Sequence, residues 1–159
     1  MKLSELLYES SVLTGFRAKD KTEAIERLVD ALAAGGRVQP PQRKAVVDAL
    51  LSRENIASTG MEHGIAIPHA TVDVLDDAVG ALGISPEGIP FQSTDGLPSR
   101  LIVLLVIPRK IIHRHIQTIA GVARLFSYDD LRDAILRATS AGEILRLIKS
   151  EEEREGGGN

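Results

Sequence analysis

Residues 101–107 read Leu-Ile-Val-Leu-Leu-Val-Ile, and this run restricts the fold of the 159-residue chain more than any other stretch. Seven apolar residues are far too few to cross a membrane. The lack of polar positions indicates a strand buried on both faces, since a half-exposed strand alternates apolar and polar residues. Pro108 follows and stops the run. We therefore expect a central strand over 101–107.

The segments around this strand predict an α/β fold. Three shorter stretches, 11–18, 65–67 and 78–84, are predicted as strands, because they are apolar and bounded by turn residues. Helical patterns occur both before and after the strands. This order favours a mixed β-sheet sandwiched between helices over a strictly alternating fold.

Capping residues and apolar spacing predict where the helices begin and end. Asp20, with Glu23 three residues later, starts the first helix, and the glycines at 35 and 36 end it. A second helix begins at Pro40-Pro41 and ends near 52–54. A later helix is expected over roughly 113–126, where Ile116, Ile119, Ala120 and Ala123 define one face. Two more are expected, one capped by Ser127 and Asp130 and one begun by the capping box of Ser140 and Glu143.

Composition and charge limit the class of protein. With 43% hydrophobic and 26% charged residues, the chain is expected to form one globular domain over residues 1–150. Residues 151–159 hold four acids, one base and three glycines, and we expect a disordered tail there. Without 151–155 the chain has 18 acids and 18 bases, and it has three Phe, two Tyr and no Trp. A body this close to neutral and this poor in aromatic residues argues against nucleic-acid binding, which needs a basic face and often stacking aromatics.

The sequence also predicts a cytoplasmic location. There is no cysteine, which suits a reducing compartment. The first seven residues contain acidic and polar side chains where a signal peptide needs an apolar core. No apolar run is long enough for membrane insertion.

The stretch 64–70, Gly-Ile-Ala-Ile-Pro-His-Ala, presents a histidine at the end of a short apolar segment. Pro68 fixes its own φ and favours an extended Ile67, so the backbone beside His69 has little freedom. Imidazole titrates near neutrality and can act as nucleophile, proton shuttle or ligand. A histidine at a turn with no chemistry is the alternative.

The other three histidines, His63, His113 and His115, raise the question of a metal site. His113 and His115 are two residues apart and would point to nearly opposite sides of a helix. There is no cysteine and no H-E-x-x-H pattern, so we expect no metal. Nucleophilic-serine and nucleotide-binding motifs are also absent from the sequence.

The remaining chemistry for His69 is phosphoryl transfer. A neutral imidazole nitrogen is a competent nucleophile toward phosphorus, and the product needs cations or hydrogen-bond donors around its oxygens. The sequence offers Arg53 at a helix end, Ser58 and Thr59 in a turn, and His115 at a helix start. These residue types allow the chemistry without establishing it.

Residues 53–69, Arg-Glu-Asn-Ile-Ala-Ser-Thr-Gly-Met-Glu-His-Gly-Ile-Ala-Ile-Pro-His, resemble a known motif. It is that of the enzyme IIA components of the phosphoenolpyruvate-dependent phosphotransferase system (PTS), of the fructose/mannitol and nitrogen-regulatory type. The resemblance implies that His69 is the phosphorylated nucleophile. It also implies that Arg53 and His115, the latter in a matching His-Ile-x-x-Ile run, stabilise the phosphoryl group. His63 and His113 match no role in the family.

The resemblance further implies a phosphohistidine carrier with no metal or organic cofactor. An HPr-like or NPr-like phosphocarrier protein would donate to His69. The branch most similar is the nitrogen-regulatory IIA, whose phosphorylation state controls its protein partners. A sugar-specific IIA that passes phosphate to a IIB domain, and a binding module on the same fold that carries no phosphate, are the alternatives. The sequence leaves a homodimer open.

Overall fold

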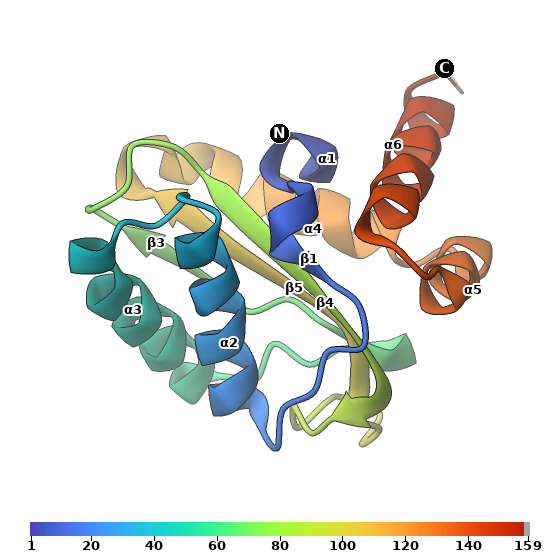
Figure 1. Cartoon of the computed structure of the whole chain (residues 1–159), viewed down its shortest axis with the longest axis horizontal. Coiled ribbons are helices and arrows are strands. Elements are labelled where there is room, and N and C mark those ends of the chain that lie inside the picture. The colour runs from blue at the N-terminus through green and yellow to red at the C-terminus, as the bar shows by residue number, and fades with distance from the viewer. Residues whose placement is uncertain (158–159) are drawn as a thin grey trace.

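The computed structural model describes residues 1–157, and within them five strands form one mixed sheet. The strand order is β1 (Val12–Leu13), β4 (Val79–Ile89), β5 (Ser99–Pro108), with β2 (Ile65–Ala66) and β3 (His69–Val72) both paired to β5. The β4–β5 pair is antiparallel and the other pairs are parallel. Figure 1 shows β4 and β5 crossing the middle of the molecule. This arrangement confirms the predicted mixed sheet between helices.

Strand β5 supplies both hydrophobic cores, which explains why its sequence lacks polar positions. Ile102, Leu104 and Val106 belong to the core under α2 and α3. The alternate residues, which face the opposite way, belong to the core under α1, α4, α5 and α6: Leu101, Val103, Leu105 and Ile107. The result is a helix–sheet–helix sandwich with a helical layer on each face of the sheet.

The helices follow the capping signals closely at the N-terminal end of the chain. The Asp20 side chain accepts a hydrogen bond from the Glu23 backbone N–H at the start of α2, and Gly35 ends that helix. At the start of α6 the Ser140 hydroxyl accepts a hydrogen bond from the Glu143 backbone N–H, as the capping box predicts, but the Glu143 carboxylate accepts from the Thr139 N–H instead of the Ser140 N–H. The helices are α1 (Leu3–Leu6), α2 (Lys21–Ala34), α3 (Arg43–Ile56), α4 (His115–Leu125), α5 (Asp129–Arg137) and α6 (Ala141–Gly157), with short 3-10 turns η1 (Glu9–Ser11), η2 (Pro40–Gln42), η3 (Glu62–Gly64) and η4 (Arg109–Arg114).

Two sequence expectations about the C-terminal helices, the inward face of α4 and the cap of α5, need correction. The fully buried residues of α4 are Thr118, Val122 and Leu125; of the expected face, Ile119 and Ala123 pack partly buried against the same core, whereas Ile116 is 75% exposed. The sequence-based assignment assumed that the buried face of this helix is made of apolar residues, but the polar Thr118 is buried as well. Helix α5 has Tyr128 at its N-cap, and the Ser127 hydroxyl instead donates back to the Arg124 carbonyl oxygen.

The acidic segment after residue 150 is helical rather than disordered. Helix α6 continues to Gly157, so 151–157 correct the expected disordered tail, and residues 158 and 159 lie outside the described part of the chain. Glu152 is buried and its carboxylate accepts a hydrogen bond from the Ser4 backbone N–H. Contact with α1 therefore orders a composition that alone would favour disorder.

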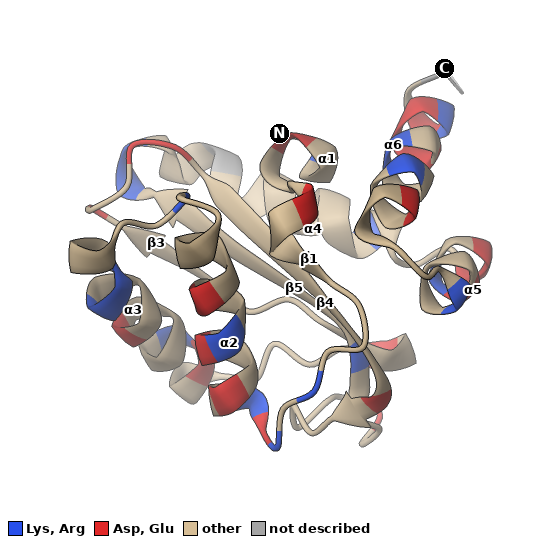
Figure 2. Ribbon diagram, in the orientation of Figure 1, with Lys and Arg blue, Asp and Glu red and all other residues tan. Residues whose placement is uncertain are grey.

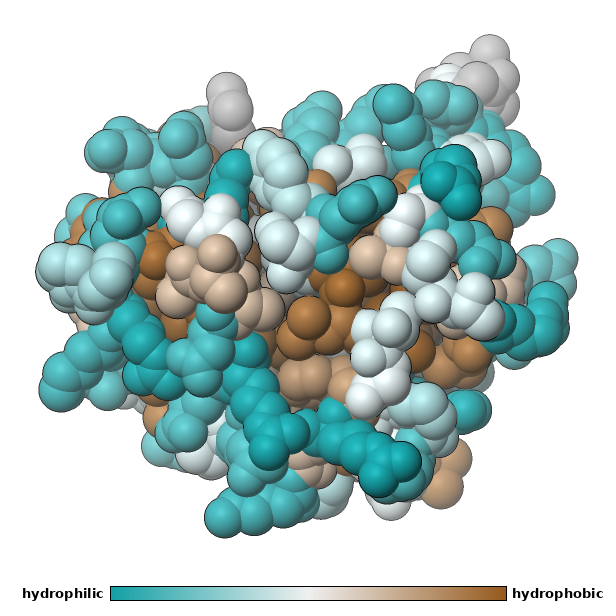
Figure 3. All heavy atoms as spheres, in the orientation of Figure 1, coloured by the Kyte–Doolittle hydropathy of each residue, from teal (hydrophilic) through white to brown (hydrophobic). Residues whose placement is uncertain are grey.

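Charged residues lie on the outer surfaces of the helices and in the loops, with both signs interspersed (Figure 2). Figure 3 shows hydrophilic residues over most of this face, with hydrophobic residues in its middle. No helix within residues 1–157 combines the length and the apolar character needed to cross a membrane.

The edge of the sheet beside β5 is interrupted at Ile67 and Pro68. Strands β2 and β3 both pair in parallel with β5, one before and one after this break. Across the break, the Pro68 carbonyl oxygen still accepts a hydrogen bond from the Leu105 backbone N–H at 3.0 Å. His69 is thereby the first residue of β3, whereas the sequence placed it at the end of a short apolar segment.

Candidate active site

His69 lines a groove of about 330 Å³ at this broken edge of the sheet. The groove lies between the C-terminal half of α3 and the start of α4. Because His69 pairs with Leu105, its side chain lies on the same face of the sheet as Leu105, the face covered by α4. The lining residues are Ala49, Ser52, Arg53, Ile56, His69, Ala70, Thr71, Arg109 and His115. The three residues predicted for the site, Arg53, His69 and His115, are therefore brought together.

A backbone hydrogen bond fixes the tautomer of the neutral His69 ring. Its Nδ1 lies 2.7 Å from the Ile67 carbonyl oxygen, which can only accept. Nδ1 therefore carries the proton and donates it, and the lone pair is left on Nε2. The Ile67 carbonyl lies two residues before His69, while the next carbonyl, that of Pro68, bonds to the Leu105 backbone N–H instead. Nε2 is the nitrogen available for nucleophilic attack.

His115 opens α4 and approaches His69, with the ring centroids 5.1 Å apart and the ring planes tilted by 56°. Its Nδ1 is buried and has no hydrogen-bond partner among the described residues. A buried N–H without an acceptor is costly, so the neutral ring keeps its proton on Nε2. His69 thus presents a lone pair on Nε2, and His115 presents an N–H donor.

Burial and a nearby cation keep both imidazoles neutral. Desolvation lowers the pKa of His69 from its ordinary value of 6.5, and the charges of Arg53 and His115 lower this pKa further. The hydrogen bond to Ile67 and the charge of Glu54 act in the opposite direction but do not reverse the shift. Desolvation, followed by the charge of Arg53, also lowers the pKa of His115. The nucleophilic form of His69 therefore predominates at neutral pH.

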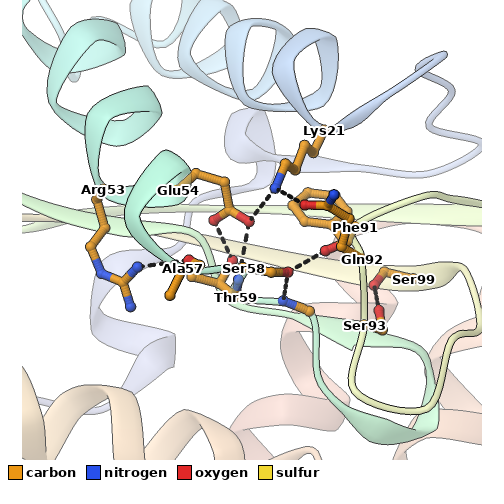
Figure 4. A network of polar contacts seen from close by, with 11 residues as sticks. Lys21, Arg53, Glu54, Ala57, Ser58, Thr59, Phe91, Gln92, Ser93 and Ser99 are labelled. Carbon is orange, nitrogen blue, oxygen red and sulfur yellow. Dashed lines mark hydrogen bonds and ion pairs between the residues drawn. The ribbon is translucent and has the colours of Figure 1, made fainter.

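Arg53 lies in the last turn of α3 and is held there by the backbone. Its Nη1 donates a 2.9 Å hydrogen bond to the carbonyl oxygen of Ala57, the residue that caps the helix. Figure 4 shows its guanidinium directed away from the neighbouring Glu54. Since this bond uses one of five N–H groups, others can still reach an anion in the groove.

The rest of the motif that contains Arg53 builds the scaffold. Glu54 is 3% exposed, and its carboxylate accepts hydrogen bonds from the Thr59 N–H at 3.0 Å and the Thr59 hydroxyl at 2.7 Å. Lys21 at the start of α2 pairs with the same carboxylate at 3.5 Å and donates to Gln92 at 2.8 Å (Figure 4). A buried carboxylate is tolerated only with such partners. Glu54 therefore ties the end of α3 to the start of α2 and to the Thr59 turn, and Lys21 extends the contact to Gln92 after β4.

Ser58 and Thr59 do not take the phosphoryl-binding role that the sequence had suggested. The Ser58 hydroxyl donates to the Phe91 carbonyl oxygen and accepts from the Gly60 N–H, while Thr59 is engaged by Glu54. Neither residue lines the groove. Their hydrogen bonds hold the turn that leads into β2. Sequence reasoning missed Glu54 because an acidic residue after Arg53 carries no sign of being buried.

The remaining histidines lie elsewhere. His63 is in η3 with a positive φ of 66°, and His113 is exposed in η4; neither lines the groove. Within residues 1–157, no group of three or more His, Asp or Glu side chains is arranged to hold a metal ion. The groove itself offers one unprotonated nitrogen, one imidazole N–H and two guanidinium groups, which is a donor set for a phosphoryl group or a similar anion.

Comparison with known proteins places the fold and the motif in one family. The sequence matches the family described as "Phosphoenolpyruvate-dependent sugar phosphotransferase system, EIIA 2" over residues 5–151. The PTS system fructose-specific EIIA component of Haloferax volcanii is 38% identical over 128 residues, which are 80% of this chain and 82% of that protein. The PTS system fructose-specific EIIABC component of Bacillus subtilis (strain 168) is 31% identical over 96% of this chain, which spans only 24% of that protein's length.

Solved structures share the fold over nearly the whole chain. The nitrogen regulatory protein IIA-Ntr of Neisseria meningitidis has a TM-score of 0.83 and 26% identity, covering 92% of this chain and 98% of that one. The enzyme IIAMTL of Escherichia coli, solved in complex with phosphorylated enzyme IIBMTL, has a TM-score of 0.76 and 26% identity. The match covers 91% of this chain and 97% of that one.

The titration of the two groove histidines is the first prediction. Both should titrate below 6.5 in pH-dependent NMR of the imidazole nitrogens, because burial and Arg53 disfavour the charged form. Replacing Arg53 by Gln should raise both pKa values. Arg100→Gln, a change outside the groove, should leave them unchanged. A pKa of His69 above 6.5 would contradict the neutral ring.

Gly60 yields the second prediction. A Cβ at this position would lie 2.9 Å from the Phe91 carbonyl oxygen and from the Ser93 Cα, so Gly60→Ala should reduce the free energy of unfolding by about 1–3 kcal/mol. Gly121 in α4 has no atom within 4 Å of such a Cβ, and Gly121→Ala should stabilise by up to about 1 kcal/mol. Urea unfolding followed by circular dichroism measures both, and equal effects would refute the close approach.

Proposed function

The chain belongs to the EIIA 2 family of the phosphoenolpyruvate-dependent sugar phosphotransferase system, and we propose that it carries a phosphoryl group on Nε2 of His69. The observation that supports this most directly is the Nδ1 hydrogen bond to the Ile67 carbonyl oxygen, which leaves the Nε2 lone pair free in a groove with cationic groups. The donor in this proposal is an HPr-like or NPr-like phosphocarrier protein.

In the transfer step, Nε2 of His69 attacks the phosphorus atom of the phosphorylated donor. The Nε2–P bond forms as the bond between phosphorus and the donor breaks, and the electron pair of that bond leaves with the donor. No proton has to be removed from His69 before attack, because Nε2 is already unprotonated. The positive charge that develops on the ring is delocalised to Nδ1–H, where the Ile67 carbonyl oxygen accepts the hydrogen bond.

Arg53 and His115 would stabilise the transferring group. The three phosphoryl oxygens gain charge in a groove that already contains the Arg53 guanidinium and the Nε2–H of His115. Arg53 is held before the phosphoryl group arrives by its hydrogen bond to Ala57, and His115 is the first residue of α4, so its backbone is part of the helix. Donors fixed in advance lower the barrier more than donors that must reorganise.

The onward partner distinguishes two roles. The relative with 38% identity and similar length is named a fructose-specific EIIA component, and the E. coli IIAMTL structure contains a phosphorylated IIB enzyme. These names favour transfer from His69 to an EIIB domain during sugar uptake. The TM-score of 0.83 with IIA-Ntr favours the second role, a nitrogen-regulatory protein whose phosphorylation state controls partner binding.

Labelling from phosphoenolpyruvate tests the carrier proposal. With enzyme I and an HPr-type donor, the wild-type chain should acquire one acid-labile, base-stable phosphoryl group, and His69→Ala should acquire none. His63→Ala and His113→Ala should be labelled like the wild type, since neither side chain lines the groove. Arg53→Gln and His115→Ala should slow labelling by about a hundredfold. A labelled His69→Ala chain would refute the assignment.

The same labelled chain then separates the two roles. A purified fructose-type or mannitol-type EIIB domain should remove the label if the chain serves sugar uptake. If no EIIB domain removes it, and binding to a protein partner differs between the phosphorylated and unphosphorylated chains, the regulatory role is supported instead.

A further inference from the structure

The groove around His69 contains a second arginine, Arg109, that neither the motif nor the proposed carrier mechanism uses. It follows the last residue of β5 and opens η4, the short turn that leads to His115. Its Nε donates a 3.0 Å hydrogen bond to Oδ1 of Asp73, in an ion pair whose side chains are 56% and 76% exposed. Arg109 is therefore a groove residue with a loose, solvent-exposed partner.

The strand register explains where this pair lies relative to His69. Val72 pairs with Pro108 at the end of the β3–β5 ladder, so Asp73 and Arg109 are the residues that directly follow the two strands. Asp73 is four residues after His69, roughly 13 Å away at the rise of an extended chain. Asp73 thus holds the guanidinium toward the far end of the same groove.

We propose that Arg109 is a second phosphoryl-binding arginine, held by Asp73 until His69 is phosphorylated and then shared with, or transferred to, the phosphoryl group. This inference rests on the proposed function. An exposed ion pair is weak, because water screens both charges and the long side chain loses freedom in forming it. A phosphoryl group brings nearly two negative charges and three acceptor oxygens into the groove. The guanidinium therefore favours the phosphoryl group over the single carboxylate of Asp73.

The movement would also change the turn before α4. Once Arg109 leaves Asp73, the start of η4 is no longer attached to the end of β3 through this pair. Ile112, in the same turn, is 50% exposed and accessible to a partner. A protein that binds η4 would then encounter two different surfaces in the phosphorylated and unphosphorylated states.

The neighbouring residue supplies a matched control. Lys110 pairs with Asp76 at 3.4 Å, with side chains 62% and 98% exposed. This pair joins the same two segments and carries the same charges, but neither of its members lines the groove. Any effect of Arg109 through loop attachment or overall charge should therefore be shared by Lys110.

The test measures the acid dissociation of the phosphoryl group itself. The full-length chain is phosphorylated with potassium phosphoramidate, which needs no protein donor, and the 31P signal missing from His69→Ala is assigned to His69. A cation beside the group stabilises its dianion and lowers its pKa. Arg109→Gln should therefore decrease the acid dissociation constant by about threefold, and Asp73→Asn, which frees Arg109, should increase it by a similar factor. Lys110→Gln should leave it within error of the wild type.

The opposite changes in the acid dissociation constant distinguish phosphoryl binding from a structural role. If the ion pair were merely structural, Arg109→Gln and Asp73→Asn would both break it and would change this constant in the same direction. The inference is overturned if Arg109→Gln matches Lys110→Gln, or if the Asp73 variant changes in the same direction as the Arg109 variant. Phosphoramidate labelling of His69 without labelling by any phosphocarrier would reject the proposed donor alone. A chain that takes no phosphoryl group on His69 from either source would reject both proposals.

Discussion

The break in the edge strand at Ile67 and Pro68 is the constraint on which the site depends. Strands β2 and β3 pair with the same strand, β5, on either side of this break, and the Ile67 carbonyl within it accepts a hydrogen bond from the His69 ring. The proline supplies no N–H at this point, so the interruption leaves one fewer backbone donor to satisfy. The tautomer of the nucleophile is thereby set by backbone geometry rather than by another ionisable side chain.

Arg53 and Glu54 are adjacent in sequence and have opposite tasks. The guanidinium lines the groove, where an anion can use it, whereas the carboxylate is buried among donors from Lys21 of α2 and from the Thr59 turn. Each task supports the other, because the buried carboxylate fixes the end of α3 and the end of α3 fixes Arg53. Desolvation and the nearby guanidinium then act on the imidazoles, which keeps the pKa of His69 below its ordinary value.

Much of the fold, and the three main residues of the candidate site, could be predicted from the sequence. The doubly apolar run at 101–107 identified the central strand and implied two helical layers, and the caps at Asp20 and Ser140 located α2 and α6. The grouping of Arg53, His69 and His115 came from a resemblance, because they lie on three separate elements. The inward face of α4 and the helical order of 151–157 depend on contacts with distant segments, which periodicity and composition do not encode. Ser58 and Thr59 do not line the groove; a hydroxyl can bind a ligand or hold a turn equally well, and the sequence does not distinguish these two roles.

The parallel pairing of His69 with Leu105 also limits how this chain can change in length. Side chains alternate across a strand, so inserting or deleting one residue between the β2 pairing at 65–66 and His69 would turn the imidazole from the α4 side of the sheet to the side of α2 and α3. A chain with one inserted residue could keep every residue of the motif and still direct the His69 side chain to the wrong face of the sheet. Evolution can therefore alter the composition of this segment far more readily than its length, whereas the loops that flank the sheet are free of that restriction.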